Sequence, residues 1–141
     1  MKSKLILVCT IAAISLSLFA CSPASKQVSV EVSGDDFMKL QHISQEVQVA
    51  AGESFTVTLC SNPTTGFEWE SAQINDQTIL QQTGHRFEGP EAKNIIGGAG
   101  KEIWTFKALK KGTSTISMEY SRPWEQGVEP AETFTLTVIV K

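Results

Sequence analysis

The amino-acid sequence predicts an all-β protein, an immunoglobulin-like antiparallel β-sandwich of about seven strands, and three observations support this class. Beyond residue 27, hydrophobic residues alternate with polar ones at the period of two that half-buried strands have. Threonine is frequent at the polar positions, which suits the solvent face of a strand. Glycine and proline separate the alternating runs, and no run of ten or more residues has a convincing helical period.

The alternating runs follow one another to the end of the chain. Their hydrophobic members are, in order, Val28, Val30 and Val32; Val47 and Val49; Phe55, Val57 and Leu59; Phe67 and Trp69; Trp104, Phe106 and Ala108; Ile116, Met118 and Tyr120; and Phe134, Leu136, Val138 and Val140. Turn sequences separate them at Ala51–Glu53, Asn62–Pro63, Gly89–Pro90, Gly97–Gly98, Lys111–Gly112 and Pro123. The stretches Asp36–Leu40 and Asn75–Leu80 allow a turn of helix at most. Trp69 is expected to be a central core aromatic.

The first 20 residues have the pattern of a secretory signal peptide. Lys2 and Lys4 give a positive start, and the uncharged stretch Leu5–Phe19 follows. This stretch has 15 residues, which is short of the roughly 20 that a membrane-spanning helix needs. A membrane anchor helix is the alternative interpretation.

The residues around the expected cleavage point resemble a bacterial lipoprotein box. Leu18-Phe19-Ala20-Cys21 has the leucine, the small residue and the obligatory cysteine, although a smaller residue than Phe19 is usual. We therefore expect a signal peptide at 1–20, a lipidated Cys21 with a polar tether at 21–27, and one domain at 28–141. Several acyl chains would hold the domain at the cell membrane or outer membrane, facing the periplasm or the exterior. Ordinary cleavage with an unmodified Cys21 is the alternative.

Composition narrows the class of function. Hydrophobic residues make up 41% and charged residues 19% of the chain, which argues against disorder. Without residues 1–20 the chain keeps 10 basic and 15 acidic residues, a net charge of −5, and it has no Lys/Arg cluster for nucleic acid. Three Cys and two His offer little for a metal site or a disulfide framework, so we expect no metal and no cofactor.

An enzyme is not expected. His42 and His85 are far in sequence from each other and from Cys60, so no nucleophile and base stand out. Cys60 ends an apolar run and is expected to be an inert, partly buried thiol. A pair of acidic residues acting in catalysis stays an open alternative.

Three connections carry unusual residues. In Asn62–Phe67, Pro63 fixes its own φ and Gly66 permits a conformation closed to other residues, so a rigid, presented loop competes with a simple hairpin turn. Ile95–Gly100 has three glycines in its last four residues, which let the backbone approach another surface, or simply make a flexible loop. Tyr120–Glu125 carries Arg and Trp, the residue types of binding hot spots. A Trp that folds back to cover the core edge is the equal alternative.

These three connections are expected to meet. In a seven-strand sandwich they correspond to the B–C, D–E and F–G loops, which lie at the same end. Loops that converge in this way suit a protein-binding tip, as in antibodies.

The three motifs together resemble those of the chagasin family, whose members inhibit papain-like cysteine proteases. The resemblance covers roughly Val47–Val140, and the order of the motifs matches. Lys101 departs from the pattern, which often has a further glycine there. The residues that carry the resemblance are Asn62, Pro63, Thr64, Thr65, Gly66 and Phe67; Gly97, Gly98, Ala99 and Gly100, followed by Trp104–Ala108; and Tyr120, Ser121, Arg122, Pro123 and Trp124.

This resemblance implies reversible, competitive inhibition by a monomer. The Asn62–Phe67 loop would enter the centre of the protease cleft, with Thr64 and Thr65 near its catalytic pair. The glycines at 97–100 and the Arg122–Trp124 segment would grip the two sides. A surface lipoprotein that uses the same sandwich to bind another ligand, as an adhesion module, is the alternative.

Overall fold

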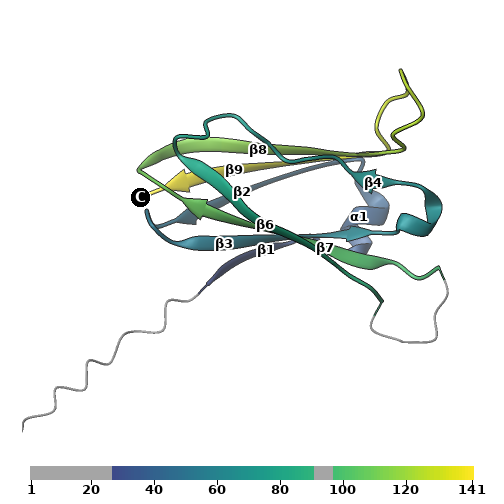
Figure 1. Cartoon of the computed structure of the whole chain (residues 1–141), viewed down its shortest axis with the longest axis horizontal. Helices are drawn as coiled ribbons and strands as arrows, with labels where there is room; N and C mark the ends of the chain where they lie inside the picture. The colour runs from purple at the N-terminus through teal and green to yellow at the C-terminus, as the bar shows by residue number, and fades with distance from the viewer. Residues whose placement is uncertain (1–26, 91–96) are drawn as a thin grey trace, which may run out of the picture.

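Two β-sheets lie face to face in the computed structural model, which describes residues 27–90 and 97–141 (Figure 1). One sheet has the strand order β1-β3-β7-β6, and the other has the order β2-β9-β8-β4, with β5 paired to β8 outside that path. The strands are β1 (Val28–Glu31), β2 (His42–Val49), β3 (Ser54–Ser61), β4 (Glu68–Trp69), β5 (Gln73–Ile74), β6 (Leu80–Glu88), β7 (Gly100–Ala108), β8 (Gly112–Ser121) and β9 (Glu132–Val140). The predicted sandwich is confirmed. The predictions for residues 1–20 and Cys21 lie outside the described residues.

Two strand pairs in this sandwich are parallel, β1 with β3 and β2 with β9. After β1 the chain crosses to the second sheet through helix α1 (Gly34–Lys39), and it crosses back between β2 and β3. The chain reverses its direction at each of these two crossings, so β3 runs parallel to β1. The other pairs are antiparallel, as the sequence predicts.

Helix α1 occupies a segment in which the sequence predicted a turn of helix at most. The Ser33 hydroxyl caps it by accepting a hydrogen bond from the backbone N–H of Asp36 at 3.1 Å. Half-buried Phe37 packs edge-on against Tyr120 and contacts Trp69, with ring centroids 5.4 and 6.1 Å apart. The helix thereby closes one end of the sandwich between β1 and β2 (Figure 1).

The core lies between the sheets and is filled by the alternating residues. Phe55, Phe106 and Phe134 are fully buried. Trp69 is 6% exposed, and its indole N–H donates to the carbonyl oxygen of Cys60 at 2.9 Å, which confirms it as a core aromatic. No helix within residues 27–90 and 97–141 is long and apolar enough to cross a membrane.

Candidate functional site

The three predicted connections lie at one end of the sandwich, which we call the tip (Figure 1). Strand register places them there, because Ser61 at the end of β3 pairs with Gly100 at the start of β7. On the other sheet, Glu68 pairs with Ser121 at the end of β8. The connections are loop 1 (Asn62–Phe67), loop 2 (between β6 and β7, with residues 91–96 outside the description) and loop 3 (residues 122–131).

Asn62 holds loop 1 in shape and ties it to its neighbours. Its backbone N–H donates to the hydroxyl of Tyr120 at 2.9 Å. Its side-chain oxygen accepts from the backbone N–H and the hydroxyl of Thr64, at 3.3 and 2.6 Å. Its side-chain NH2 donates to the carbonyl oxygen of Gly97 in loop 2 at 3.1 Å, and its own carbonyl accepts the Thr65 hydroxyl at 2.7 Å. One residue therefore joins loop 1, loop 2 and strand β8.

Pro63–Thr65 form a single 3-10 turn that ends at Gly66, and this glycine has two structural reasons to be there. Its φ is +80°, in the left-handed region that favours glycine. A Cβ at this position would also clash with Cη2 of Trp124. The indole of loop 3 therefore rests directly on the backbone of loop 1.

Arg122 turns inward and links loop 3 to loop 1. Its guanidinium lies 4.3 Å from the centre of the Phe67 ring, which itself stacks on Tyr120. Its Nε donates to the carbonyl oxygen of Thr65 at 3.3 Å, and its Nη1 donates to Glu125 at 3.1 Å. These contacts make Arg122 and Phe67 supports of the tip, and their contact with a protease, which the resemblance implies, stays a prediction.

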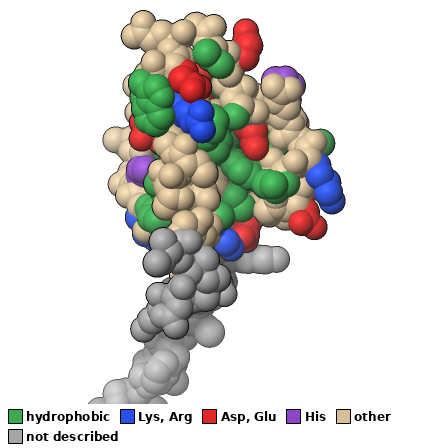
Figure 2. Space-filling view, turned by 90° about the vertical axis from the view of Figure 1, so that its right-hand side faces the viewer, with side chains coloured by type: hydrophobic (Ala, Val, Ile, Leu, Met, Phe, Trp, Pro, Cys, Tyr) green, Lys and Arg blue, Asp and Glu red, His purple; other side chains and the backbone are tan. Residues whose placement is uncertain are grey.

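Several side chains of loops 1 and 3 are exposed at the tip. Pro63, Thr64 and Thr65 of loop 1 are exposed, as is Pro123 of loop 3. Trp124 is 66% exposed despite its contact with loop 1. Figure 2 views this end of the molecule and shows hydrophobic side chains running across it between basic and acidic ones.

The glycines of the second motif have different roles in the structure. Gly97 has a φ of +80° and receives the bond from loop 1, Gly98 is half-buried, and Ala99 is exposed. Gly100 is buried inside β7, where a Cβ would lie 2.6 Å from the ring of Phe87. Internal packing alone therefore accounts for the glycine at position 100.

Lys101, which departs from the pattern of the resembled family, forms an ion pair across its sheet. Its Nζ donates to the Glu31 carboxylate at 2.7 Å, and the two residues lie on strands β7 and β1 of the same sheet.

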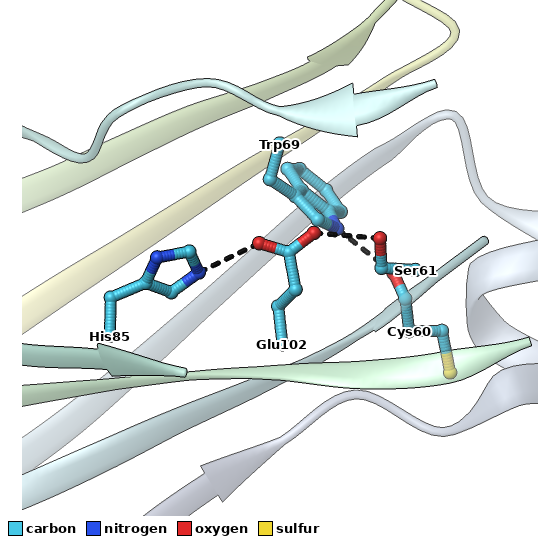
Figure 3. A network of polar contacts seen from close by, with 5 residues as sticks. All are labelled: Cys60, Ser61, Trp69, His85 and Glu102. Atoms are coloured by element: carbon cyan, nitrogen blue, oxygen red, sulfur yellow. Dashed lines mark hydrogen bonds and ion pairs between the residues drawn. The ribbon is translucent and has the colours of Figure 1, made fainter. Parts of the chain in front are cut away.

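A buried carboxylate on β7 organises a polar network at the base of the tip (Figure 3). Glu102 is 7% exposed; it accepts from the Ser61 hydroxyl at 2.7 Å and contacts His85 Nε2 at 2.7 Å. The His85 ring stacks on Trp104, with centroids 4.8 Å apart. Because Glu102 stands between the hydroxyl and the imidazole, this is not the serine–histidine contact that activates a nucleophile. It is a buried, hydrogen-bonded carboxyl group that links strands β3, β6 and β7.

Two ionisable groups near the tip are perturbed by burial. Burial raises the pKa of the half-buried Cys60 thiol, which disfavours the reactive thiolate, and Figure 3 shows its sulfur directed away from the Glu102 network. Burial also raises the pKa of Glu132, at the start of β9, to about 7. One oxygen of Glu132 is buried without a hydrogen-bond partner. The described residues contain no cluster of His, Cys, Asp or Glu suited to a metal ion.

The fold and the tip together define a β-sandwich binding protein whose three loops are locked to one another. The model of the chagasin family of peptidase inhibitors (family I42) matches residues 48–138. The chain therefore belongs to the chagasin family.

Relatives agree with this assignment, and a solved structure agrees with the fold. Amoebiasin-2 of Entamoeba histolytica is 32% identical over 95 residues, covering 67% of this chain and 76% of the relative. Chagasin of Trypanosoma cruzi is 29% identical over 98 residues, covering 67% and 88%. The crystal structure of a cysteine protease inhibitor from Entamoeba histolytica superposes with a TM-score of 0.65 at 22% identity, covering 82% of this chain and 98% of that one.

Sequence reasoning named most of the loop residues that form the tip and missed the supports that lie in the strands and in helix α1. Tyr120 was assigned to the core from its alternation, which says nothing about the partner of its hydroxyl. Glu102 stands at an inward-facing position of the β7 pattern, and a charge at such a position was the available signal of a buried network. Phe37 stands in a segment too short to show a helical period.

Proposed function

We propose that this protein inhibits papain-like cysteine proteases reversibly and competitively, by inserting its tip into the active-site cleft. The observation that supports this best is the locked tip, in which Asn62 and Arg122 hold the loops while Thr64, Thr65 and Trp124 stay exposed. Loops that are already ordered lose little conformational entropy on docking, which favours tight binding.

Each exposed element has a part in this proposal. Thr64 and Thr65 sit on the 3-10 turn at the front of loop 1 and offer hydroxyl and backbone groups to the catalytic pair of the protease. Trp124 buries its indole against one side of the cleft, as aromatic hot spots do. Gly97–Ala99 lay backbone along the other side.

No chemical step belongs to this mechanism, and the protein acts as a monomer and not as an enzyme. The thiol of Cys60 is half-buried, with a raised pKa, and belongs to β3 instead of a loop. Because no covalent bond forms, we expect the protease to regain full activity after the inhibitor dissociates.

A titration of papain tests the function. The full chain, purified in detergent, is added to papain with a fluorogenic dipeptide substrate, and trypsin serves as a control protease. We expect the apparent inhibition constant to rise linearly with substrate concentration, activity to return on dilution, and trypsin to be unaffected. Fully active papain at a micromolar concentration of the chain would contradict the proposal.

We further propose that Cys21 carries lipid and anchors the protein to the cell membrane or the outer membrane after export. The described chain enters β1 at the end of the sandwich opposite the tip (Figure 1), so an anchor before residue 27 leaves the tip directed away from the membrane. Cys21→Ser is expected to move the protein from the membrane fraction to the soluble fraction and to abolish labelling by radioactive palmitate. Unchanged membrane association would refute the anchor and leave the inhibition proposal untouched.

A further inference from the structure

Exposed hydrophobic side chains are distributed unevenly over the molecule. Among the residues that the structure describes, six large ones are exposed, and strand register and loop position put five of them in or beside the tip. These five are Met38, Leu40, Phe87, Trp124 and Val128. The sixth, Leu109, lies at the opposite end, between β7 and β8. Single exposed hydrophobic residues need no explanation, but a set gathered at one end indicates a binding surface.

Two of the five, Met38 and Leu40, belong to a part of the chain that the family match does not cover. That match begins at residue 48, whereas Met38 lies in helix α1 and Leu40 is its C-terminal cap. We call these two side chains the α1 patch. They are an addition to the three loops.

Contacts within the fold connect α1 to loop 1. Phe37, next to Met38, packs on Tyr120 with ring centroids 5.4 Å apart, and the Tyr120 hydroxyl accepts the backbone N–H of Asn62 at 2.9 Å. At the other end of the helix, a Cβ on Gly34 would lie 3.8 Å from the sulfur of Cys60, near the end of β3. The helix is therefore built into the same end of the sandwich as loop 1.

Packing within the protein does not account for the α1 patch. Met38 is 82% exposed and Leu40 is 47% exposed, and α1 has no fully buried residue. Phe37 supplies the contact of the helix with the core, and the next residue of a helix points about 100° away from it. Asp35 and Lys39 lie beside the patch, which gives it the polar rim common at interfaces.

We propose that the α1 patch is a fourth contact with the cysteine protease bound by the three loops. This inference rests on the proposed function. The protease is the occupant because α1 lies at the same end of the sandwich as the three loops (Figure 1) and is joined to loop 1 through Phe37 and Tyr120. The flexible, polarizable side chain of Met38 suits contact with a partner surface of variable shape.

Substituting Met38→Gln tests the inference with the full chain in detergent. Glutamine keeps similar length and helix propensity, and an 82% exposed position should tolerate it, so the thermal unfolding midpoint should stay the same. Leu109→Gln, at the opposite end, is the matched control, and Trp124→Ala reports on the loops. We expect Met38→Gln to raise the inhibition constant for papain about tenfold, mainly through faster dissociation, and Leu109→Gln to change it less than about twofold.

The outcomes separate this inference from the proposed function. If Trp124→Ala weakens inhibition while Met38→Gln does not, the fourth contact is refuted and the loop mechanism stands. If the unsubstituted chain fails to inhibit papain, both proposals fall. If Met38→Gln converts a dimer into a monomer and leaves the inhibition constant unchanged, the patch joins two copies of this chain and the inference is wrong.

Discussion

Replacing Trp124 by alanine tests the tip most directly. A tryptophan side chain has about 250 Å² of surface, and the 66% that is exposed here is worth about 4 kcal/mol if all of it becomes buried. Ordering the side chain takes back about 1 kcal/mol, and part of the ring edge stays in solvent. A loss of about 2 kcal/mol or more remains, as at other aromatic hot spots. We therefore expect the inhibition constant for papain to rise about thirtyfold or more.

The assay measures steady-state inhibition at several substrate concentrations, with thermal unfolding in parallel. Because most of the indole is in solvent, the unfolding midpoint should move little, so a change in inhibition reports on binding. Leu109→Ala removes an exposed hydrophobic side chain at the opposite end and should have no effect. An inhibition constant for Trp124→Ala within about twofold of the unsubstituted value would show that the indole is outside the interface.

Three further predictions concern two supports of the tip, Gly66 and Asn62, and the buried carboxyl of Glu132. Gly66→Ala should weaken inhibition about as much as Trp124→Ala, because its Cβ would displace the indole; Gly52→Ala has a similar positive φ of +88° with open space around it and should leave inhibition unchanged. Asn62→Asp keeps the side-chain oxygen that accepts within loop 1 but removes the NH2 group that donates to loop 2. We expect about tenfold weaker inhibition and faster amide exchange in loop 1. Unchanged amide exchange would contradict this role of Asn62. The pKa of Glu132 is raised from 4.5 to about 7 in the folded state, so its contribution to stability should be full below pH 4.5 and decline until about pH 7. Glu132→Gln should remove that decline, worth about 1 kcal/mol after solvent screening, and denaturant titrations at several pH values will measure it.

The sandwich was predictable because the alternation of hydrophobic and polar residues that specifies it is local in the sequence. Alternation along β3, β7, β8 and β9 assigned the inward faces correctly, and the fully buried Phe55, Phe106 and Phe134 all stand at predicted positions. The parallel pairing of β1 with β3 was not predictable, because it depends on where the chain changes sheets. Helix α1 was underestimated because its stability depends on the Ser33 cap and on the packing of Phe37, and neither appears as a period in the sequence.

In the candidate site, too, some residues were predictable from local sequence and others were not. The exposed side chains Thr64, Thr65 and Trp124 stand in motifs that are visible in the sequence. Asn62 was expected in the protease contact. Its bonds to loop 2 and β8 were not predictable, because those partners are 35 and 58 residues away. Arg122 was expected to face a partner, and its bond to loop 1 depends on how β4 and β8 bring the two loops together.

The parallel pairing of β1 with β3 has a mechanical consequence. If the proposed anchor at Cys21 and a protease held at the tip pull against each other, the force acts along the axis of β1. The four residues of β1 are in register with Phe55–Thr58 of β3, so the hydrogen bonds between the strands are loaded together in shear instead of being opened one after another. The lysine of β7 that bonds to Glu31 adds a side-chain link across the same sheet. A short edge strand can thus transmit tension from the membrane to the tip without peeling away.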